Sequence, residues 1–365
     1  MRFPVLLFFL ALCSPAVSGQ EKPATPPAPA AETPAAPKSH PWSKAALEVV
    51  AATNRKEFDK AFATAKKAAG EGDVDCVFLL GRLFENGYGT KVDAAAALRQ
   101  YVMAAEKGHL EAKFNWARCL AEGIGGKVDN EKSDFLLQQA AEAGFGAAQS
   151  RMGRLELDAV RRPRNEVAAR EWFEKAAAQN DPEALYRMAL CHQNGWGGLA
   201  KDLKKALENL LKAANAGYVE AINLVGIYYQ HGIELRQDKV AAAGWFRYAA
   251  EYGHPAALSN LGQCYEFGQG VKPDIATAVK YYQEAASKGD GAGHLNLGRC
   301  HDAGRGLPAS PVLAYAHFFR SYELGTEAAA KLRDDAKARL TPQQLQEAEK
   351  TLTGWKAVKP AADNE

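Results

Sequence analysis

Recurrent glycine pairs are the first feature of this sequence that could do chemistry. In LGQCYEFGQGVKPD, residues 261–274, one residue separates Gly268 from Gly270. Glycine-rich loops bind phosphate through backbone N–H groups, but they follow a strand and lead into a helix. Here the pair follows apolar residues at helical spacing and lacks the third glycine or Lys–Ser pair of a phosphate loop; it recurs at 87–89, 123–125, 195–197 and 304–306. We therefore predict turns between helices, in which glycine adopts positive φ.

Cysteine could supply a nucleophile, a metal ligand or a disulfide. Apart from Cys13, the sequence has Cys76, Cys119, Cys191, Cys264 and Cys300. Cys264 and Cys300 stand 36 residues apart, at the same place in successive repeats, so helix packing should separate them by about 10 Å. A disulfide needs Cα atoms within about 7 Å. These thiols are therefore expected to be unpaired, buried and apolar in character.

Histidine and serine patterns give no sign of a reaction centre. His192 and His301 occupy the place that holds Phe84 in a sister repeat, so we expect them to pack as aromatic residues. His294 and His301 are seven residues apart, two helical turns, which is too far for one metal ion without other ligands. The sequence has no Gly-x-Ser-x-Gly motif. We expect no metal, no cofactor and no enzymatic activity.

A row of arginines could bind carboxylates. Arg82, Arg118 and Arg154 are 36 residues apart, and Arg299 holds the equivalent place in a later repeat. The planar guanidinium suits an acidic peptide or a chain terminus. An alternative is local pairing on each helix, because acidic residues stand three or four positions onward, at Glu85, Glu122, Asp158 and Asp302. The sequence leaves both interpretations open.

Three landmarks with one period show which elements must position these residues. The first ends each unit, at intervals of 36, 36, 36, 37, 36, 36 and 36: Gly72, Gly108, Gly144, Asn180, Gly217, Gly253, Gly289 and Gly325. The second is a small residue: Gly81, Ala117, Gly153, Ala189, Gly226, Gly262 and Gly298. The third suits a helix N-cap: Asp93, Asp129, Asn165, Asp202, Asp238, Asp274 and Ser310. Seven internal repeats are therefore predicted.

Each repeat is predicted to form two helices. The first, as in PAALSNLGQCYEFG, has helical apolar spacing and ends at a glycine. The second begins after the N-cap Asp274, and it presents Tyr281 and Tyr282 among small alanines as a packing face. The small residue at Gly262 implies close approach by a neighbouring helix.

These residues resemble the Sel-1-like repeat family, relatives of the tetratricopeptide repeats. The family pattern is matched at Ala257, Leu261–Gly262, Tyr265, Gly268–Gly270, Asp274, Ala278, Tyr281–Tyr282 and Ala285–Gly289. The resemblance covers about 250 residues. The stretch 340–355 also resembles the closing helix of bacterial members, with Thr341 and Gln344 forming a capping box.

The resemblance implies an all-α, right-handed superhelical solenoid that serves protein–protein contact. It places the arginine row, Arg82, Arg118, Arg154 and Arg299, on the concave groove. Some secreted members clamp each repeat with two cysteines, but no repeat here has two. A scaffold that binds a protein or peptide, with an acidic segment as candidate, is therefore favoured over a cell-wall or β-lactam hydrolase. A peptidoglycan or glycan module is the other alternative, because Trp196 and Tyr88 in the loops could stack on sugars.

Charge and the amino-terminal segment indicate where the protein works. With 45 basic and 43 acidic residues, the net charge of +2 gives no attraction to nucleic acid. Residues 1–19 combine Arg2, an apolar run of nine residues and small residues before Gly19, which predicts a cleaved secretory signal. An uncleaved anchor and a lipid on Cys13 are the alternatives. Nine apolar residues are too few to span a bilayer.

The predicted organisation follows from these features. A signal peptide at 1–19 precedes a Pro/Ala-rich linker at 20–43 and amino-terminal capping helices at 44–72. The repeats are 73–108, 109–144, 145–180, 181–217, 218–253, 254–289 and 290–325. Carboxy-terminal capping helices at 326–358 and a tail at 359–365 follow. The absence of Asn-x-Ser/Thr sequons favours an exported protein of the bacterial periplasm or exterior.

Overall fold

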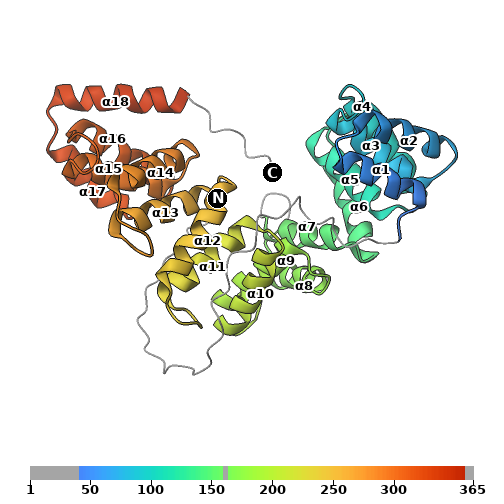
Figure 1. Ribbon diagram of the computed structural model, residues 1–365, viewed down its shortest axis with the longest axis horizontal. Helices are drawn as coiled ribbons and strands as arrows, with labels where there is room; N and C mark the ends of the chain where they lie inside the picture. Colours follow the sequence, from blue (N-terminus) through green and yellow to red (C-terminus); the bar gives the residue numbers. More distant parts are fainter. Residues whose placement is uncertain (1–40, 159–162, 358–365) are drawn as a thin grey trace. The chain divides into compact units, whose positions relative to one another are not determined.

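The computed structural model describes residues 41–158 and 163–357, which form 18 α-helices without a strand (Figure 1). The all-α fold predicted from the repeats is confirmed. The helices belong to two compact units that meet in sequence between Ala216 and Gly217. The predicted signal peptide and most of the linker lie outside the described residues.

The helices of the amino-terminal unit are α1 (Lys44–Asn54), α2 (Phe58–Gly70), α3 (Val74–Asn86), α4 (Ala94–Glu106), α5 (Leu110–Glu122), α6 (Asn130–Glu142), α7 (Gly146–Leu157), α8 (Glu166–Ala177), α9 (Pro182–Asn194) and α10 (Leu203–Asn215). Those of the carboxy-terminal unit are α11 (Val219–His231), α12 (Lys239–Glu251), α13 (Pro255–Phe267), α14 (Ile275–Ser287), α15 (Gly291–Ala303), α16 (Pro311–Glu323), α17 (Ala329–Ala338) and α18 (Pro342–Ala357).

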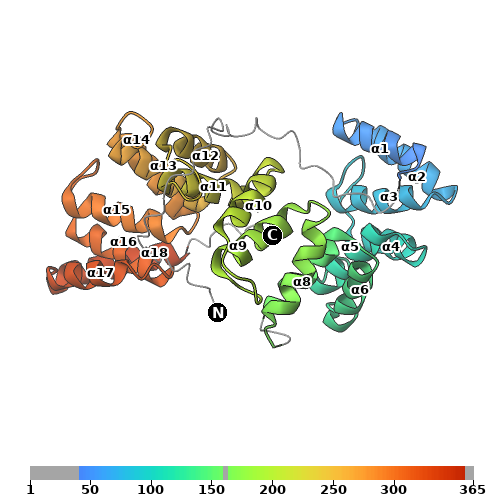
Figure 2. The same cartoon turned by 90° about the horizontal axis from the view of Figure 1, so that it is seen from below.

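Within each unit the helices pack as successive hairpins (Figures 1 and 2). In the amino-terminal unit α3 pairs with α4 and α5 with α6, and each second helix also contacts the first helix of the next hairpin, as α4 contacts α5. In the carboxy-terminal unit α13 pairs with α14 and α15 with α16 in the same manner. The first helices therefore carry one set of equivalent faces and the second helices another.

The second helix of each repeat begins where a side chain caps it. Asp93, Asp129 and Asp202 each accept a hydrogen bond from the backbone N–H three residues onward, at 2.8, 3.0 and 3.0 Å. The same bond forms at the other four caps, Asn165, Asp238, Asp274 and Ser310. Each bond satisfies an N–H of the first turn that has no partner within its helix, so the predicted N-caps are confirmed.

The small residue of the first helix makes room for the second helix. A methyl group at Gly262 would meet the Tyr282 ring at 2.5 Å, and one at Gly298 would meet Phe318 at 2.5 Å. Glycine faces an aromatic ring in the same way at Gly81, Gly153 and Gly226. Where the small residue is alanine, at 117 and 189, the position equivalent to Tyr282 holds leucine, at 137 and 210. The size of one residue thus compensates for that of the other.

The second glycine of each Gly-x-Gly loop lies against the preceding repeat. Gly270 has φ +76, and a methyl group there would meet the Lys239 carbonyl oxygen, in the first turn of α12, at 1.9 Å. Gly125 lies in the same way against Ala94 at the start of α4, at 2.2 Å. These loops follow helices and contact a helix of the preceding hairpin, so the prediction that they are turns is confirmed. The glycines allow both the backbone angle and the close approach.

Two further helices close the carboxy-terminal unit. α16 contacts both α17 and α18. Thr341 and Gln344 form the predicted capping box at the start of α18, with N–H···O distances of 2.9 and 3.3 Å. Among the described helices, none combines the length and the apolar character needed to cross a membrane.

Candidate partner-binding surface

The arginines of the row lie on equivalent places of first helices. Arg82, Arg118 and Arg154 belong to α3, α5 and α7 of the amino-terminal unit, whereas Arg299 belongs to α15 of the carboxy-terminal unit. Arg82 and Arg299 are exposed, and Arg118 is half-buried. Three of the four arginines therefore share one unit.

Arg118 connects two successive repeats. Its guanidinium donates to Glu85 of α3 at 2.5 Å and also lies 3.6 Å from Glu122 on its own helix. The Tyr101 hydroxyl donates to the same Glu85 carboxylate at 2.6 Å. Burial and the bond to Glu85 raise the pKa of Tyr101, so the phenol stays protonated. Although burial opposes its charge, the bond to Glu85 raises the pKa of Arg118.

The carboxy-terminal unit repeats this arrangement with another arginine. The Tyr282 hydroxyl donates to Glu266 at 2.6 Å, and Arg305 of the next repeat donates to the same carboxylate. Arg305 comes from a Gly-x-Gly loop rather than from the row. The carboxylate at this place of the first helix thus accepts from its own repeat and from the following one.

Arg154 is also bridged to the next repeat. Its Nη1 lies 3.5 Å from Glu183 at the start of α9, and Arg187 approaches the same carboxylate oxygen at 3.4 Å. Arg187 was not among the predicted residues, although its place two residues before the small residue of its helix could have signalled it. One carboxylate therefore faces two guanidinium groups, on α7 and α9, and balances the charge of one of them.

Arg82 and Arg299 differ from the paired members of the row. Within the described residues, no carboxylate lies within 4.0 Å of either guanidinium. The acids that could have paired with them locally bind elsewhere: Glu85 accepts from Arg118, and Asp302 accepts from Arg339 at 2.7 Å. Of the local ion pairs that the sequence suggested, the one between Arg118 and Glu122 is present.

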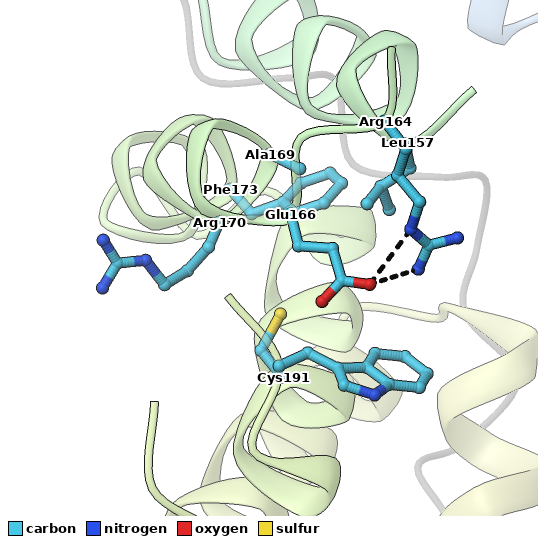
Figure 3. A pocket seen from close by; sticks show the side chains of 8 residues that line it. Leu157, Arg164, Glu166, Ala169, Arg170, Phe173 and Cys191 are labelled. Carbon is cyan, nitrogen blue, oxygen red and sulfur yellow. Dashed lines mark hydrogen bonds and ion pairs between the residues drawn. The ribbon is translucent and has the colours of Figure 1, made fainter. Parts of the chain in front are cut away.

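The two best-defined recesses are too small for an ordinary small-molecule ligand. One, lined by residues of α5, α6 and α7 that include Arg118 and Arg151, encloses about 10 Å³. The other encloses about 20 Å³, and Figure 3 shows Arg164 and Glu166 facing each other there while Arg170 points away. Such volumes hold about one water molecule, whereas drug-sized ligands occupy pockets of about 300 Å³ or more.

The loop aromatics considered for sugar stacking differ in their surroundings. Trp196 lines the recess that contains Arg164 and Glu166, and it is 41% exposed. Tyr88 is 36% exposed, but its ring stacks on Phe58 with centroids 4.4 Å apart. No ring contact between the two residues is found in the described part of the chain.

The cysteines have the character expected from the sequence. Cys76, Cys119, Cys191, Cys264 and Cys300 are unpaired and buried. Burial raises the pKa of the Cys264 and Cys300 thiols to about 11, so they stay protonated and unreactive at neutral pH. Over residues 41–158 and 163–357, no three His, Cys, Asp or Glu side chains are arranged to hold a metal ion.

Comparison with protein families follows the repeats seen in the structure. The family model described as "Sel1 repeat" matches residues 74–109, 110–145, 146–181, 182–218, 219–254, 255–290 and 291–326. Each match begins at the first residue of a first helix and includes the whole hairpin that this helix opens.

Relatives are found in fungi and bacteria. Chitin synthase regulatory factor 3 of Schizosaccharomyces pombe is 29% identical over 165 residues, 44% of this chain and 18% of that protein. Chitin synthase regulator SKT5 of Saccharomyces cerevisiae is 28% identical over 197 residues, 51% of this chain and 28% of that protein. The chain thus spans less than a third of either protein.

Solved structures agree on the fold. Protein c5321, a protective antigen of uropathogenic Escherichia coli with an SLR fold, superposes with a TM-score of 0.68 at 29% identity, over 81% of this chain and 64% of that one. A Sel1 repeat protein of Oxalobacter formigenes superposes with a TM-score of 0.57 at 23% identity, over 67% of this chain and 97% of that one. At that identity, the second likeness concerns the fold alone.

Proposed function

The chain belongs to the Sel1 repeat family, and we propose that it is a non-catalytic scaffold of the cell envelope that binds a protein or peptide in its concave groove. Sel1 repeats generally mediate protein interactions. The predicted export signal supports an envelope location, in the periplasm or outside the cell. The acidic segment of a partner would bind along the first helices, at Arg82, Arg118 and Arg154, with Arg299 contributing to a second contact.

The observation that carries this proposal is the exposed Arg82 at the start of a row on the first helices of three consecutive repeats. Its guanidinium has no carboxylate within reach among the described residues. Arg118 and Arg154 are paired, but a guanidinium has five N–H donors, so each retains donors for a further acceptor. A carboxylate at Arg82 would form a charge-assisted hydrogen bond without displacing an existing partner.

The proposal is tested with a fluorescent oligoglutamate peptide and its oligoglutamine counterpart, followed by anisotropy at low and moderate salt. Arg82→Glu should weaken oligoglutamate binding about tenfold, because it removes one charge-assisted bond and adds repulsion. Adding Arg118→Glu and Arg154→Glu should abolish binding while helix content stays the same. Binding should also fall with salt.

Arg99→Glu is the matched control, because Arg99 is exposed on α4, the second helix of the same repeat. It should leave binding nearly unchanged. Equal binding of both peptides by the native chain, or equal weakening by Arg82→Glu and Arg99→Glu, would contradict the proposed role of the row.

A glycan-binding module is the second candidate, favoured by the exposure of Trp196 beside Glu166. Aromatic rings bind sugars with their exposed faces, whereas Tyr88 is stacked on Phe58. Titration with soluble peptidoglycan fragments separates the candidates. The glycan alternative requires binding that Trp196→Ala removes, and the scaffold proposal predicts no binding.

A further inference from the structure

Three histidines meet in the last hairpin of the carboxy-terminal unit. His294 and His301 belong to α15 and His317 to α16, and these residues are 8%, 9% and 8% exposed. The Nδ1 atoms of His294 and His317 lie 3.0 Å apart. The rings of His301 and His317 are stacked with centroids 5.6 Å apart. Such burial is uncommon for three groups that titrate near neutral pH.

The closing helix covers this cluster. Trp355 of α18 lies with its ring centroid 4.6 Å from that of His317 and 5.4 Å from that of His294. Few other side chains of α18 are buried. Ala348 and Leu352 are 0% and 6% exposed, and most of the remaining residues of the helix are exposed. The contact between Trp355 and the imidazoles is therefore one of the few side-chain contacts that hold α18 in place, beside those of Leu345, Ala348 and Leu352.

The hydrogen bond between His294 and His317 requires at least one neutral imidazole. One of the two facing Nδ1 atoms must donate and the other must accept, so at least one of these rings is unprotonated at Nδ1. His301 uses its own Nδ1 to donate to the Pro308 carbonyl at 3.0 Å. Protonating both His294 and His317 would place two N–H groups and two positive charges 3.0 Å apart, away from water.

The surrounding charges also disfavour protonation. Burial, and then Arg320 of α16, lowers the pKa of His294 to about 4, although the Ala286 carbonyl of α14 acts in the opposite direction. Burial, followed by His294 and His301, lowers the pKa of His317 to about 3. No carboxylate contributes to either shift, and α18 contributes the uncharged Trp355.

We propose that His294, His301 and His317 form an acid-sensitive latch, which releases α18 from α15 and α16 while the helical hairpins remain folded. Release admits water to the imidazoles and removes the penalty for charging them. It also uncovers the face of α16 that α18 covers at neutral pH. This inference does not depend on the proposed partner.

The direction of the pH dependence follows from the lowered pKa values. In the released state the imidazoles of His294 and His317 titrate near 6.5, whereas in the docked state these two titrate at about 4 and about 3. Well above pH 6.5 the imidazoles are neutral in both states, and docking has its full stability. Below 6.5 the released state binds more protons, so docking weakens progressively as the pH falls toward 4.

Hydrogen exchange of the full chain, read by mass spectrometry between pH 7 and pH 4 and corrected for the intrinsic exchange rate, tests the latch. α18 should lose protection with a midpoint between these values, while α11–α14 keep theirs. The double variant His294→Leu/His317→Phe replaces both histidines by the kinds of residue that sister repeats hold at these places. Leu258 is equivalent to His294, and the aromatic Tyr281 is equivalent to His317. It should keep α18 protected across the range.

His231→Gln is the matched control, since His231 is an exposed histidine of α11, and it should leave the transition unchanged. Proton NMR of the imidazole C2–H groups gives an independent measurement if the double variant folds poorly: two histidines of the native chain should titrate well below 6.5, in the pH range in which α18 loses protection. Continued protection of α18 down to pH 4, an identical transition in the double variant, or histidines that all titrate near 6.5 would overturn the latch.

Discussion

At the scale of single residues, the repeats depend on matched pairs across each hairpin. Glycine on the first helix faces Tyr101, Phe173, Phe246, Tyr282 or Phe318 on the second. In the two repeats where alanine replaces glycine, the partner place holds leucine. The pairing shows that the volume of the two side chains together, rather than the identity of either one, is what the hairpin requires.

This pairing predicts a coupled response to substitution. Gly262→Ala places a methyl group 2.5 Å from the Tyr282 ring, and overpacking should cost about 1–3 kcal/mol. Tyr282→Leu alone should be costly, because it loses ring contacts and the hydrogen bond to Glu266. In the Tyr282→Leu background, Gly262→Ala should become neutral or stabilising, as the natural Ala117 and Leu137 combination suggests.

Urea unfolding followed by circular dichroism measures this double-mutant cycle. The control is Gly289→Ala, where a methyl group meets nothing within 4 Å and Tyr282→Leu should not change its cost. Equal costs of Gly262→Ala in the two backgrounds would contradict the packing account.

The sequence predicted the local features of single residues better than their contacts with residues of other helices. The N-caps and the unpaired cysteines follow from local geometry and repeat spacing, and both predictions are confirmed. The partner of Glu85 is Arg118, 33 residues away, rather than an arginine on its own helix. The histidine cluster was missed because His317 completes it from another helix, 23 residues after His294.

At the scale of elements, the Gly-x-Gly loop fastens each hairpin to the preceding one. Its second glycine lies on the first turn of a second helix, as Gly270 does on α12. Its middle residue also reaches back: Gln269 accepts from Gln230 at 3.0 Å, and Arg305 binds Glu266. The sequence predicted the turn, but this contact between repeats required the structure.

The contact predicts that two glycines with similar backbone angles respond differently to alanine. Gly270 and Gly289 have φ +76 and +82, so Ala at either place carries the penalty for a left-handed conformation, about 1–2 kcal/mol. Gly270→Ala should cost considerably more, because its methyl group would also collide with the Lys239 carbonyl.

Thermal unfolding of the two variants beside the native chain measures the difference. Gly270→Ala should also raise hydrogen exchange at the start of α12, whereas Gly289→Ala should not. Equal melting temperatures would show that the backbone angle alone explains the glycine.

At the scale of the whole molecule, repetition made the fold predictable. Three landmarks with one period specified helical hairpins, and the structure and the family comparison agree with them. The repeat pattern predicts function less well than it predicts the fold, because we expect a partner to bind at places where the repeats differ. The place that holds Arg82, Arg118 and Arg154 in three successive repeats holds Leu190 and Ile227 in the next two, so this surface differs between repeats.

The central claim is that a protein or peptide partner binds on the first helices of the repeats. Hydrogen exchange of the chain with and without a captured envelope partner, or with the oligoglutamate peptide, tests it most directly. The account predicts new protection in α3, α5 and α7 around Arg82, Arg118 and Arg154. Protection confined to second helices such as α4 and α6, or to the loop of Trp196, would contradict it.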